Sequence, residues 1–75
     1  MDLSSAIATT LKKYRETKNL SQEELAFLSG IDRTYISLIE RSKRKPTVHV
    51  IYLICQSLDI RLSEFFLEVE NLLNK

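Results

Sequence analysis

The sequence predicts an all-α domain of five helices. Gly30 and Pro46 are the only glycine and the only proline among 75 residues, whereas the tight turns of strand-rich folds need such residues. Apolar residues instead recur at steps of three and four, which is the period of a helix. The chain is about half the length of a typical domain, so we expect one domain, 1–75. Its small core leaves stability marginal unless a partner subunit helps.

The first two helices have clear signals for their starts and stops. Ile7, Leu11 and Tyr14 form the apolar stripe of the first helix. Asn19 follows it and tolerates the left-handed conformation that ends many helices. Ser21 and Glu24 have the spacing of a capping box, in which each side chain binds a backbone N–H of the other residue. The first two helices therefore cover about 4–17 and 22–28.

The other three helices are each preceded by a side chain that caps well. Asp32, Thr47 and Ser63 stand at these starts, and each can accept a hydrogen bond from a free N–H of the first turn. The predicted ranges are about 33–41, 47–58 and 63–73. The residues expected on the inward faces of the third and fourth helices are Ile36 and Ile39, then Ile51, Ile54, Cys55 and Leu58.

The second and third helices have the residue spacing of a helix-turn-helix, over about 22–41. With Gln22 counted as the first position, Ala26 is the fifth, where two crossing helices come too close for a large side chain. Gly30 is the ninth, where the turn needs a positive φ that glycine adopts at little cost. Leu25, Ile36 and Ile39 fall at the positions that point into the core. Few helical sequences meet all five demands.

The charged residues are separated along the chain. Lysine and arginine total 11 and aspartate and glutamate total 10, so the net charge is only +1. Positions 33–45 nevertheless hold five basic residues and one acidic residue, whereas positions 59–75 hold four acidic and two basic residues. The basic segment predicts contact with the phosphates of DNA. The alternative is a solvated run of charge without function.

Three residues of the third helix are candidates for reading DNA bases. In a helix-turn-helix, the early residues of the second helix reach the base edges. Arg33 can donate two hydrogen bonds to a guanine, and Thr34 can offer its hydroxyl or its methyl group. Leu38 has two interpretations that the sequence leaves equal: apolar contact with a thymine methyl, or an exposed leucine at the edge of the core.

A second group of residues is predicted to hold the DNA backbone. Tyr35 and Ser37 suit phosphate contact better than base readout, although Tyr35 could instead pack its ring on the protein. Gln22 stands at the N-terminus of the second helix, where free N–H groups and the helix dipole favour an anion. We expect two or three of the four cations that follow the third helix to touch phosphates: Arg41, Lys43, Arg44 and Lys45.

The segment Ser21–Arg41, SQEELAFLSGIDRTYISLIER, resembles the Xre/Cro family of phage-repressor-like helix-turn-helix proteins. Arg15 and the SEFF segment at 63–66 resemble it too, so the likeness covers nearly the whole chain. The resemblance implies a five-helix phage-repressor-like DNA-binding domain, a backbone clamp at Gln22, and a structural ion pair between Arg15 and Glu40. Ser42 departs from the family, which usually has glycine after the recognition helix.

The DRTYIS segment at 32–37 and the short length are similar to the controller proteins of restriction–modification systems. This resemblance implies a transcription regulator that binds a palindromic operator as a homodimer and both activates and represses its own operon. Double-stranded DNA, a second copy of the chain, a second dimer on an adjacent operator site and RNA polymerase are then the expected partners. The alternatives are a prophage-type repressor and an antitoxin-like module that binds a partner protein.

The fifth helix is the candidate for dimerisation, because it has more apolar residues than the edge of a five-helix core needs. Phe65 and Phe66 are about 100° apart on a helix, so they cannot point the same way. We expect one to fill the core and the other to face a partner subunit. The alternative is that all of these residues cover a single core. The predicted interface is Phe65, Phe66, Val69, Leu72 and Leu73.

The composition argues against several other classes of protein. One cysteine excludes an intramolecular disulfide, and with one histidine no zinc site is expected. No apolar run approaches 18 residues and no signal peptide is visible, so a cytoplasmic protein is predicted. No catalytic set and no phosphate-binding glycine loop occur, so neither an enzyme nor a cofactor is predicted. Cys55 is interpreted as core filler, with a redox sensor as the alternative, and His49 as a surface residue.

Overall fold

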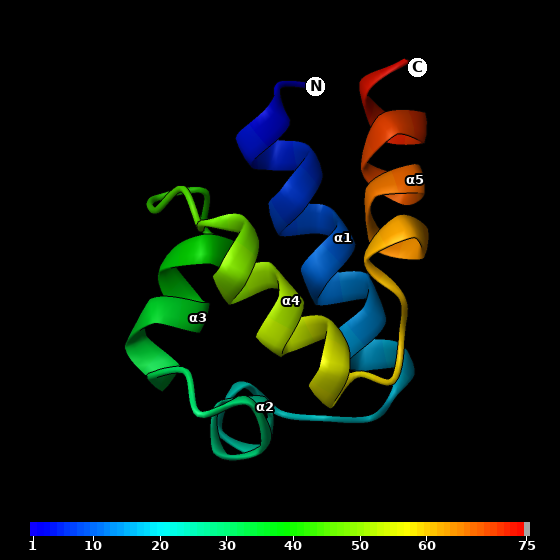
Figure 1. Ribbon diagram of the computed structural model, residues 1–75. Coiled ribbons are helices and arrows are strands. Elements are labelled where there is room, and N and C mark those ends of the chain that lie inside the picture. Colours follow the sequence, from blue (N-terminus) through cyan, green and yellow to red (C-terminus); the bar gives the residue numbers. More distant parts are fainter. Residues whose placement is uncertain (75) are drawn as a thin grey trace.

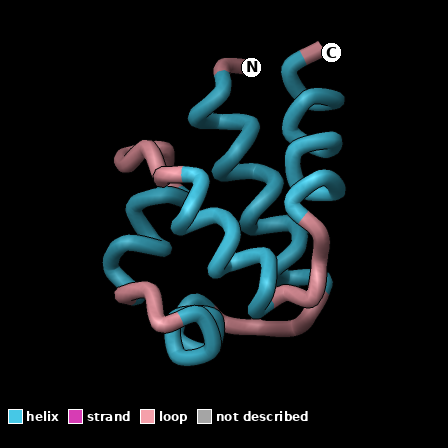
Figure 2. The backbone as a smooth tube through the Cα atoms, viewed as in Figure 1, coloured by secondary structure: helices cyan, strands magenta, loops and turns pink. Residues whose placement is uncertain are grey.

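The computed structural model describes residues 1–74, which form five helices joined by short loops (Figures 1 and 2). No strand occurs in this part of the chain, so the prediction of an all-α fold is confirmed. The described residues span 32 × 24 × 22 Å along the principal axes. The helices are α1 (Leu3–Thr17), α2 (Gln22–Ser29), α3 (Arg33–Glu40), α4 (Val48–Ser57) and α5 (Leu62–Leu73).

Helices α1 and α5 each begin one residue earlier than predicted. At each start, a carboxylate accepts a hydrogen bond from a backbone N–H group. The Asp2 carboxylate accepts a hydrogen bond of 2.8 Å from the backbone N–H of Ser5, so α1 begins at Leu3. Ser63 is not the cap of α5: the Glu64 carboxylate accepts from the backbone N–H of Arg61 at 3.1 Å. Arg61 is therefore the N-cap residue of α5.

The predicted caps of the helix-turn-helix are present. Ser21 Oγ accepts from the backbone N–H of Glu24 at 3.0 Å, and the Glu24 carboxylate accepts from the N–H of Ser21 at 2.9 Å. Backbone hydrogen bonding to Ser21 lowers the pKa of Glu24. Gly30 has φ +72°, and a Cβ built there would meet nothing within 4 Å. The turn therefore needs glycine for its backbone conformation and not for lack of space.

Three other helix ends are closed by residues other than glycine in the left-handed region. Asn19, Ser42 and Asp59 have φ of 59°, 58° and 55°. After α3, the Ser42 N–H donates to the Ile39 carbonyl at 3.0 Å and the Lys43 N–H to the Leu38 carbonyl at 2.8 Å. This is the hydrogen-bond pattern of a Schellman motif. Ser42 thus takes the left-handed conformation at the position where the Xre/Cro family usually has glycine.

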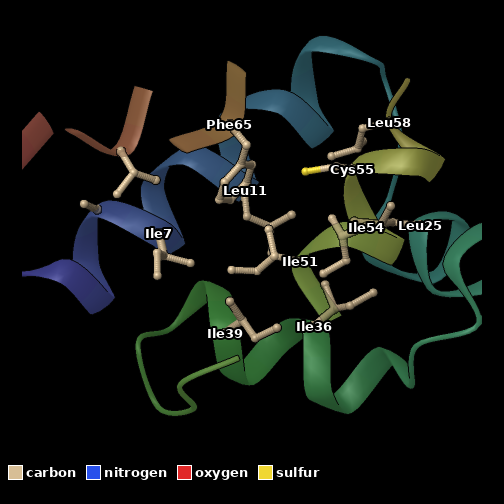
Figure 3. Packing of buried hydrophobic residues seen from close by; sticks show 12 residues of the cluster. Ile7, Leu11, Leu25, Ile36, Ile39, Ile51, Ile54, Cys55, Leu58 and Phe65 are labelled. Carbon is tan, nitrogen blue, oxygen red and sulfur yellow. The ribbon is translucent and has the colours of Figure 1, made fainter. Parts of the chain in front are cut away.

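Helix α4 lies at the centre of the core (Figure 3). Its Ile51, Ile54 and Cys55 point between the other helices and are at most 3% exposed. Ile36 and Ile39 of α3 approach them from one side, as Figure 3 shows. All of the residues predicted to face inward from α3 and α4 are buried.

Helix α5 lies antiparallel beside α1, on the other side of the molecule from α3 (Figure 1). The Phe65 ring stacks on Tyr14 of α1 with their centroids 6.4 Å apart. Lys13 donates a hydrogen bond of 2.8 Å to Glu68 across the same pair of helices. The first and fifth helices are thus joined by apolar packing with an ion pair at its edge.

The predicted dimer interface needs a correction at two residues. Phe65 is 1% exposed and Val69 is 2% exposed, so neither side chain can contribute contact area to a second protomer. Both fill the core under α1. Phe66 and Leu72 are half-buried and Leu73 is exposed, so these three are the residues of the predicted set that α5 leaves accessible.

The remaining sequence interpretations concern single residues and the membrane. Cys55 is buried, and burial raises the pKa of its thiol to about 11, so the thiol is protonated and shielded from oxidants. This favours core filler over a redox sensor. His49 is exposed on α4. Within residues 1–74, no helix has both the length and the apolar character needed to cross a membrane.

Candidate nucleic-acid interface

Helix α3 presents opposite faces to the core and to the outside. Asp32 caps it, with its carboxylate accepting from the Thr34 N–H at 2.7 Å. Ile36 and Ile39 anchor the inner face, whereas Arg33 and Thr34 of the first turn are exposed. The two predicted base readers at the start of α3 are therefore accessible, as entry into a DNA groove requires.

Arg33 extends toward α2. Its Nε lies 3.8 Å from a carboxylate oxygen of Glu23, and both side chains are largely exposed. Exposed ion pairs of this kind contribute little to stability. Arg33 can therefore leave Glu23 at small cost.

Ser37 and Leu38 are both half-buried. Leu38 does not belong to the group of partly buried residues that pack against the core. Its partial exposure fits both interpretations, contact with a thymine methyl and a leucine at the edge of the core. The Ser37 carbonyl accepts a backbone hydrogen bond from the Arg41 N–H at 3.0 Å, at the end of α3.

Tyr35 connects the recognition helix, α3, to the basic loop that follows it, residues 42–46. Its ring is half-buried against the core, and the Arg44 guanidinium carbon lies 5.1 Å from the ring centroid. This is within the range of a cation–π contact. The ring therefore packs on the protein, which was the alternative interpretation of Tyr35. It also keeps the Arg44 side chain beside α3.

The basic loop follows α3 directly and lies at its C-terminal end (Figure 1). Its left-handed start at Ser42 turns the chain away from the helix axis. All four predicted phosphate ligands in this region have exposed side chains: Arg41, Lys43, Arg44 and Lys45.

Arg15 and Glu40 form the predicted ion pair beneath this surface. Arg15 Nε donates to Glu40 Oε2 at 2.7 Å, and Arg15 Nη2 donates to Oε1 at 2.9 Å. The two side chains are 10% and 4% exposed. Arg15 Nη1 also donates to the Leu20 carbonyl at 2.8 Å.

The hydrogen bonds to Glu40 raise the pKa of Arg15, although burial opposes this. The pair joins α1, the turn before α2, and the end of α3.

Gln22 has a contact that the sequence interpretation did not include. Its Nε2 donates to Glu40 Oε1 at 3.1 Å, so the predicted phosphate clamp also belongs to the ion-pair network. A shallow cleft of about 430 Å³ opens beside it at the N-terminus of α2, lined by Arg15, Ser21, Gln22, Glu23 and Arg33. The 18-residue separation of Gln22 and Glu40 gives no periodic signal, because their contact depends on the angle between α2 and α3.

The geometry is that of a helix-turn-helix with an accessible recognition helix and an adjacent basic loop. Residues 11–65 match the helix-turn-helix family HTH_3. The chain belongs to this family, in agreement with the resemblance to the Xre/Cro proteins.

Within the family, the chain is similar to controller proteins of restriction–modification systems. It is 39% identical over 59 residues to the control protein C.SmaI of Serratia marcescens, covering 79% of this chain and 70% of that protein. It is 40% identical over 70 residues to the control protein C.MunI of Mycoplasma sp, covering 92% of this chain and 95% of that protein.

Solved structures give the same result. The restriction–modification controller protein C.Esp1396I, in its wild-type crystal structure, is 37% identical, with a TM-score of 0.91 over 100% of this chain and 96% of that chain. The tetramer of the same protein in complex with its natural 35-base-pair operator has a TM-score of 0.91, covering 100% of this chain and 99% of that chain.

Proposed function

We propose that this protein is a DNA-binding transcription regulator of the controller type, acting as a homodimer on a palindromic operator. The observation that carries the proposal is the shared surface of Arg33, Thr34 and the basic loop. Arg33 and Thr34 are exposed at the start of α3 and the cations of the basic loop at its end, while α3 is anchored from behind by Ile36 and Ile39. A surface of this kind offers base contacts and phosphate contacts at once.

Two sets of residues divide the work in this proposal. Arg33, Thr34 and Leu38 face the bases. Phosphate contact falls to Gln22, Tyr35, Ser37 and two or three of the four cations Arg41, Lys43, Arg44 and Lys45. Because phosphate contacts fix orientation but carry no sequence information, the operator preference depends on the first set.

Dimerisation follows from the limited reach of one recognition helix. One helix reads only a few base pairs, and a two-fold dimer doubles the site with half-sites about one DNA turn apart, roughly 34 Å. Helix α5 lies on the side of the molecule away from α3 (Figure 1). It leaves Phe66, Leu72 and Leu73 accessible. A dimer joined there keeps both recognition helices free for DNA.

The similarity to C.SmaI, C.MunI and C.Esp1396I supports a controller role in a restriction–modification operon. The C.Esp1396I tetramer on a 35-base-pair operator supports two dimers on adjacent sites. Activation as well as repression of the operon brings in RNA polymerase as a further partner, and the site of action is the cytoplasm. Genes for a methyltransferase and an endonuclease beside this one would fit the role, and their absence would favour a prophage-type repressor.

Selection of duplexes from a randomised pool tests the proposal. We expect the protein to enrich a palindromic sequence and to bind it in a gel shift with an affinity that falls steeply as salt increases. A duplex of scrambled sequence and equal composition is the control. Recovery of no preferred sequence, together with equal binding of both duplexes, would contradict a sequence-specific regulator.

A further inference from the structure

The Arg15–Glu40 pair receives a third partner that a purely structural ion pair does not need. Glu40 Oε1 accepts from Arg15 Nη2 at 2.9 Å and from Gln22 Nε2 at 3.1 Å. The Glu40 side chain is 4% exposed and Gln22 is half-buried. Water competes little for this hydrogen bond, so the orientation of the Gln22 amide is fixed before any ligand arrives.

The first turn of α2 leaves two backbone donors beside that amide. The capping box uses the N–H of Ser21 and of Glu24. Within residues 1–74, the N–H groups of Gln22 and Glu23 have no acceptor. They point out of the helix N-terminus, where the cleft lined by Arg15, Gln22 and Arg33 opens. An amide held at this place adds a side-chain donor to two backbone donors.

We propose that Glu40 is a positioning residue for DNA binding, which holds the Gln22 amide so that its second N–H faces a backbone phosphate. The inference rests on the proposed function, because it assumes that α2 meets DNA at its N-terminus. Arg15 also takes part in this arrangement. Its charge neutralises Glu40, so that the carboxylate behind the amide does not repel the approaching phosphate.

The arrangement also links phosphate contact to the recognition helix. Glu40 is the last residue of α3, and Gln22 is the first residue of α2. A phosphate held by Gln22 is therefore connected through one carboxylate to the end of the helix that carries Arg33. One carboxylate thus contacts the N-terminal residue of α2 from the C-terminal end of α3.

A double-mutant cycle tests this role. Gln22→Leu removes the amide at nearly equal volume, and Glu40→Asp keeps a carboxylate for Arg15 but withdraws it from Gln22 by one methylene. We expect each change to weaken binding to the selected duplex and to the scrambled duplex alike, by about tenfold per protomer for Gln22→Leu. The double variant is expected to be no weaker than Gln22→Leu alone. Additive losses, or a loss confined to the selected duplex, would overturn the inference.

A measurement on the free protein complements the cycle and needs no variant at Glu40. The chain has two glutamines, Gln22 and Gln56, and Gln56 is exposed on α4 with its amide donating to the Tyr52 hydroxyl at 2.9 Å. We expect the side-chain amide protons of Gln22 to exchange with water several times more slowly than those of Gln56 in NMR spectra. Equal exchange rates would show that Glu40 does not hold the amide.

The controls separate this inference from the proposed function. Gln56→Leu, at the far end of α4, is expected to leave DNA binding unchanged. If the wild-type protein binds neither duplex, the proposed function fails. If the wild-type protein binds and Glu40→Asp binds equally well, the regulator stands and the positioning role falls.

Discussion

Arg33 and Lys43 are both exposed cations, but they have different surroundings on the interface. Arg33 opens α3, where side chains reach base edges, and Lys43 lies in the loop beyond its end. We expect Arg33→Ala to lower affinity for the selected duplex by about 1–3 kcal/mol and to relax the preference at one position of each half-site. Repeating the selection with the variant measures both effects.

Lys43→Ala is the matched comparison for this prediction. It removes a phosphate contact, so binding should weaken by a similar factor on every sequence and the dependence on salt should become shallower. Titrations at several salt concentrations measure the slope. An altered base preference in Lys43→Ala, or an unaltered one in Arg33→Ala, would reverse the two assignments.

Thr10 is the one side chain in residues 1–74 with a buried polar atom that has no hydrogen-bond partner. It is fully buried on α1. A buried hydroxyl without a partner destabilises the folded state, and valine has the same branched shape without the hydroxyl. We expect Thr10→Val to raise the free energy of unfolding by about 1 kcal/mol. Urea unfolding measures it, with the exposed Thr9→Val as a control expected to show little change.

At the residue scale, the sequence predicts a residue's role well when a single structural requirement limits the choice of residue at that position. Gly30 is predictable because a positive φ at the turn limits the choice of residue, and Ile36 because the helical period points it inward. Gln22 has two demands, a surface contact and a bond to Glu40. The second depends on how α2 crosses α3, which no local pattern contains.

The Schellman motif at Ser42 is the element-scale feature with the clearest effect on stability. A residue other than glycine in the left-handed region is disfavoured by about 1–2 kcal/mol. Glycine avoids this strain, but it loses more chain entropy on folding, so the net gain from a change to glycine is smaller. We therefore expect Ser42→Gly to stabilise the protein by about 0.5–1 kcal/mol. Thermal unfolding checks the sign.

Ser63→Gly is the matched control for Ser42→Gly. Ser63 is exposed inside α5, where the backbone is helical. Glycine is a poor helix former, so this change should lower stability by about 0.5 kcal/mol. Two shifts of the same sign would mean that the conformation of Ser42 does not limit stability.

The buried ion pair joins α1 to the end of α3. Glu40→Ala leaves the Arg15 guanidinium buried without a counter-charge, which destabilises folded proteins by about 3–5 kcal/mol. We expect a large fall in the melting temperature of this variant, measured by circular dichroism. An unchanged melting curve would show that Arg15 finds water or another acceptor.

Helix boundaries show where element-scale prediction is limited. Ser21, Asp32 and Thr47 act as the caps that the sequence indicates. At α1 and α5, the structure uses Asp2 and Glu64 instead, because carboxylates reach the free N–H groups one turn away. Several side chains near each start could satisfy the same donors, so local pattern alone does not decide among them.

The whole molecule divides into a DNA side with α3 and an opposite side with α5. Replacing an accessible apolar residue of α5 with a charged one should therefore break a dimer without unfolding the protomer. We expect Phe66→Glu or Leu73→Glu to shift the protein from dimer to monomer in sedimentation while the helical signal in circular dichroism survives. Leu67→Glu, at a residue that is exposed on the same helix and outside the predicted interface, is the control.

The outcomes of this test are distinct. If both variants stay dimeric, the interface lies elsewhere than α5. If the parent protein sediments as a monomer at tens of micromolar and on DNA, the two-fold arrangement is wrong. The Leu67→Glu variant should behave as the parent does.

The sequence predicts that Phe65 and Phe66 face different ways, but not which one faces the core. That choice follows from the register of α5 against α1, which places Phe65 on Tyr14 and leaves Phe66 at its edge, 5.5 Å from the Phe65 ring. Register between segments far apart in the chain depends on the assembled fold. The class of fold was accessible from periodicity and caps, and this tertiary detail was not.

The ribosome makes α1 first and α5 last, yet these two helices pack side by side. At a synthesis rate of about 5–20 residues per second, α5 follows α3 by roughly two to seven seconds. Until Phe65 and Val69 emerge, the part of α1 that α5 packs against has no cover. We expect translation that stalls in this interval to leave apolar surface of α1 exposed to proteases and chaperones.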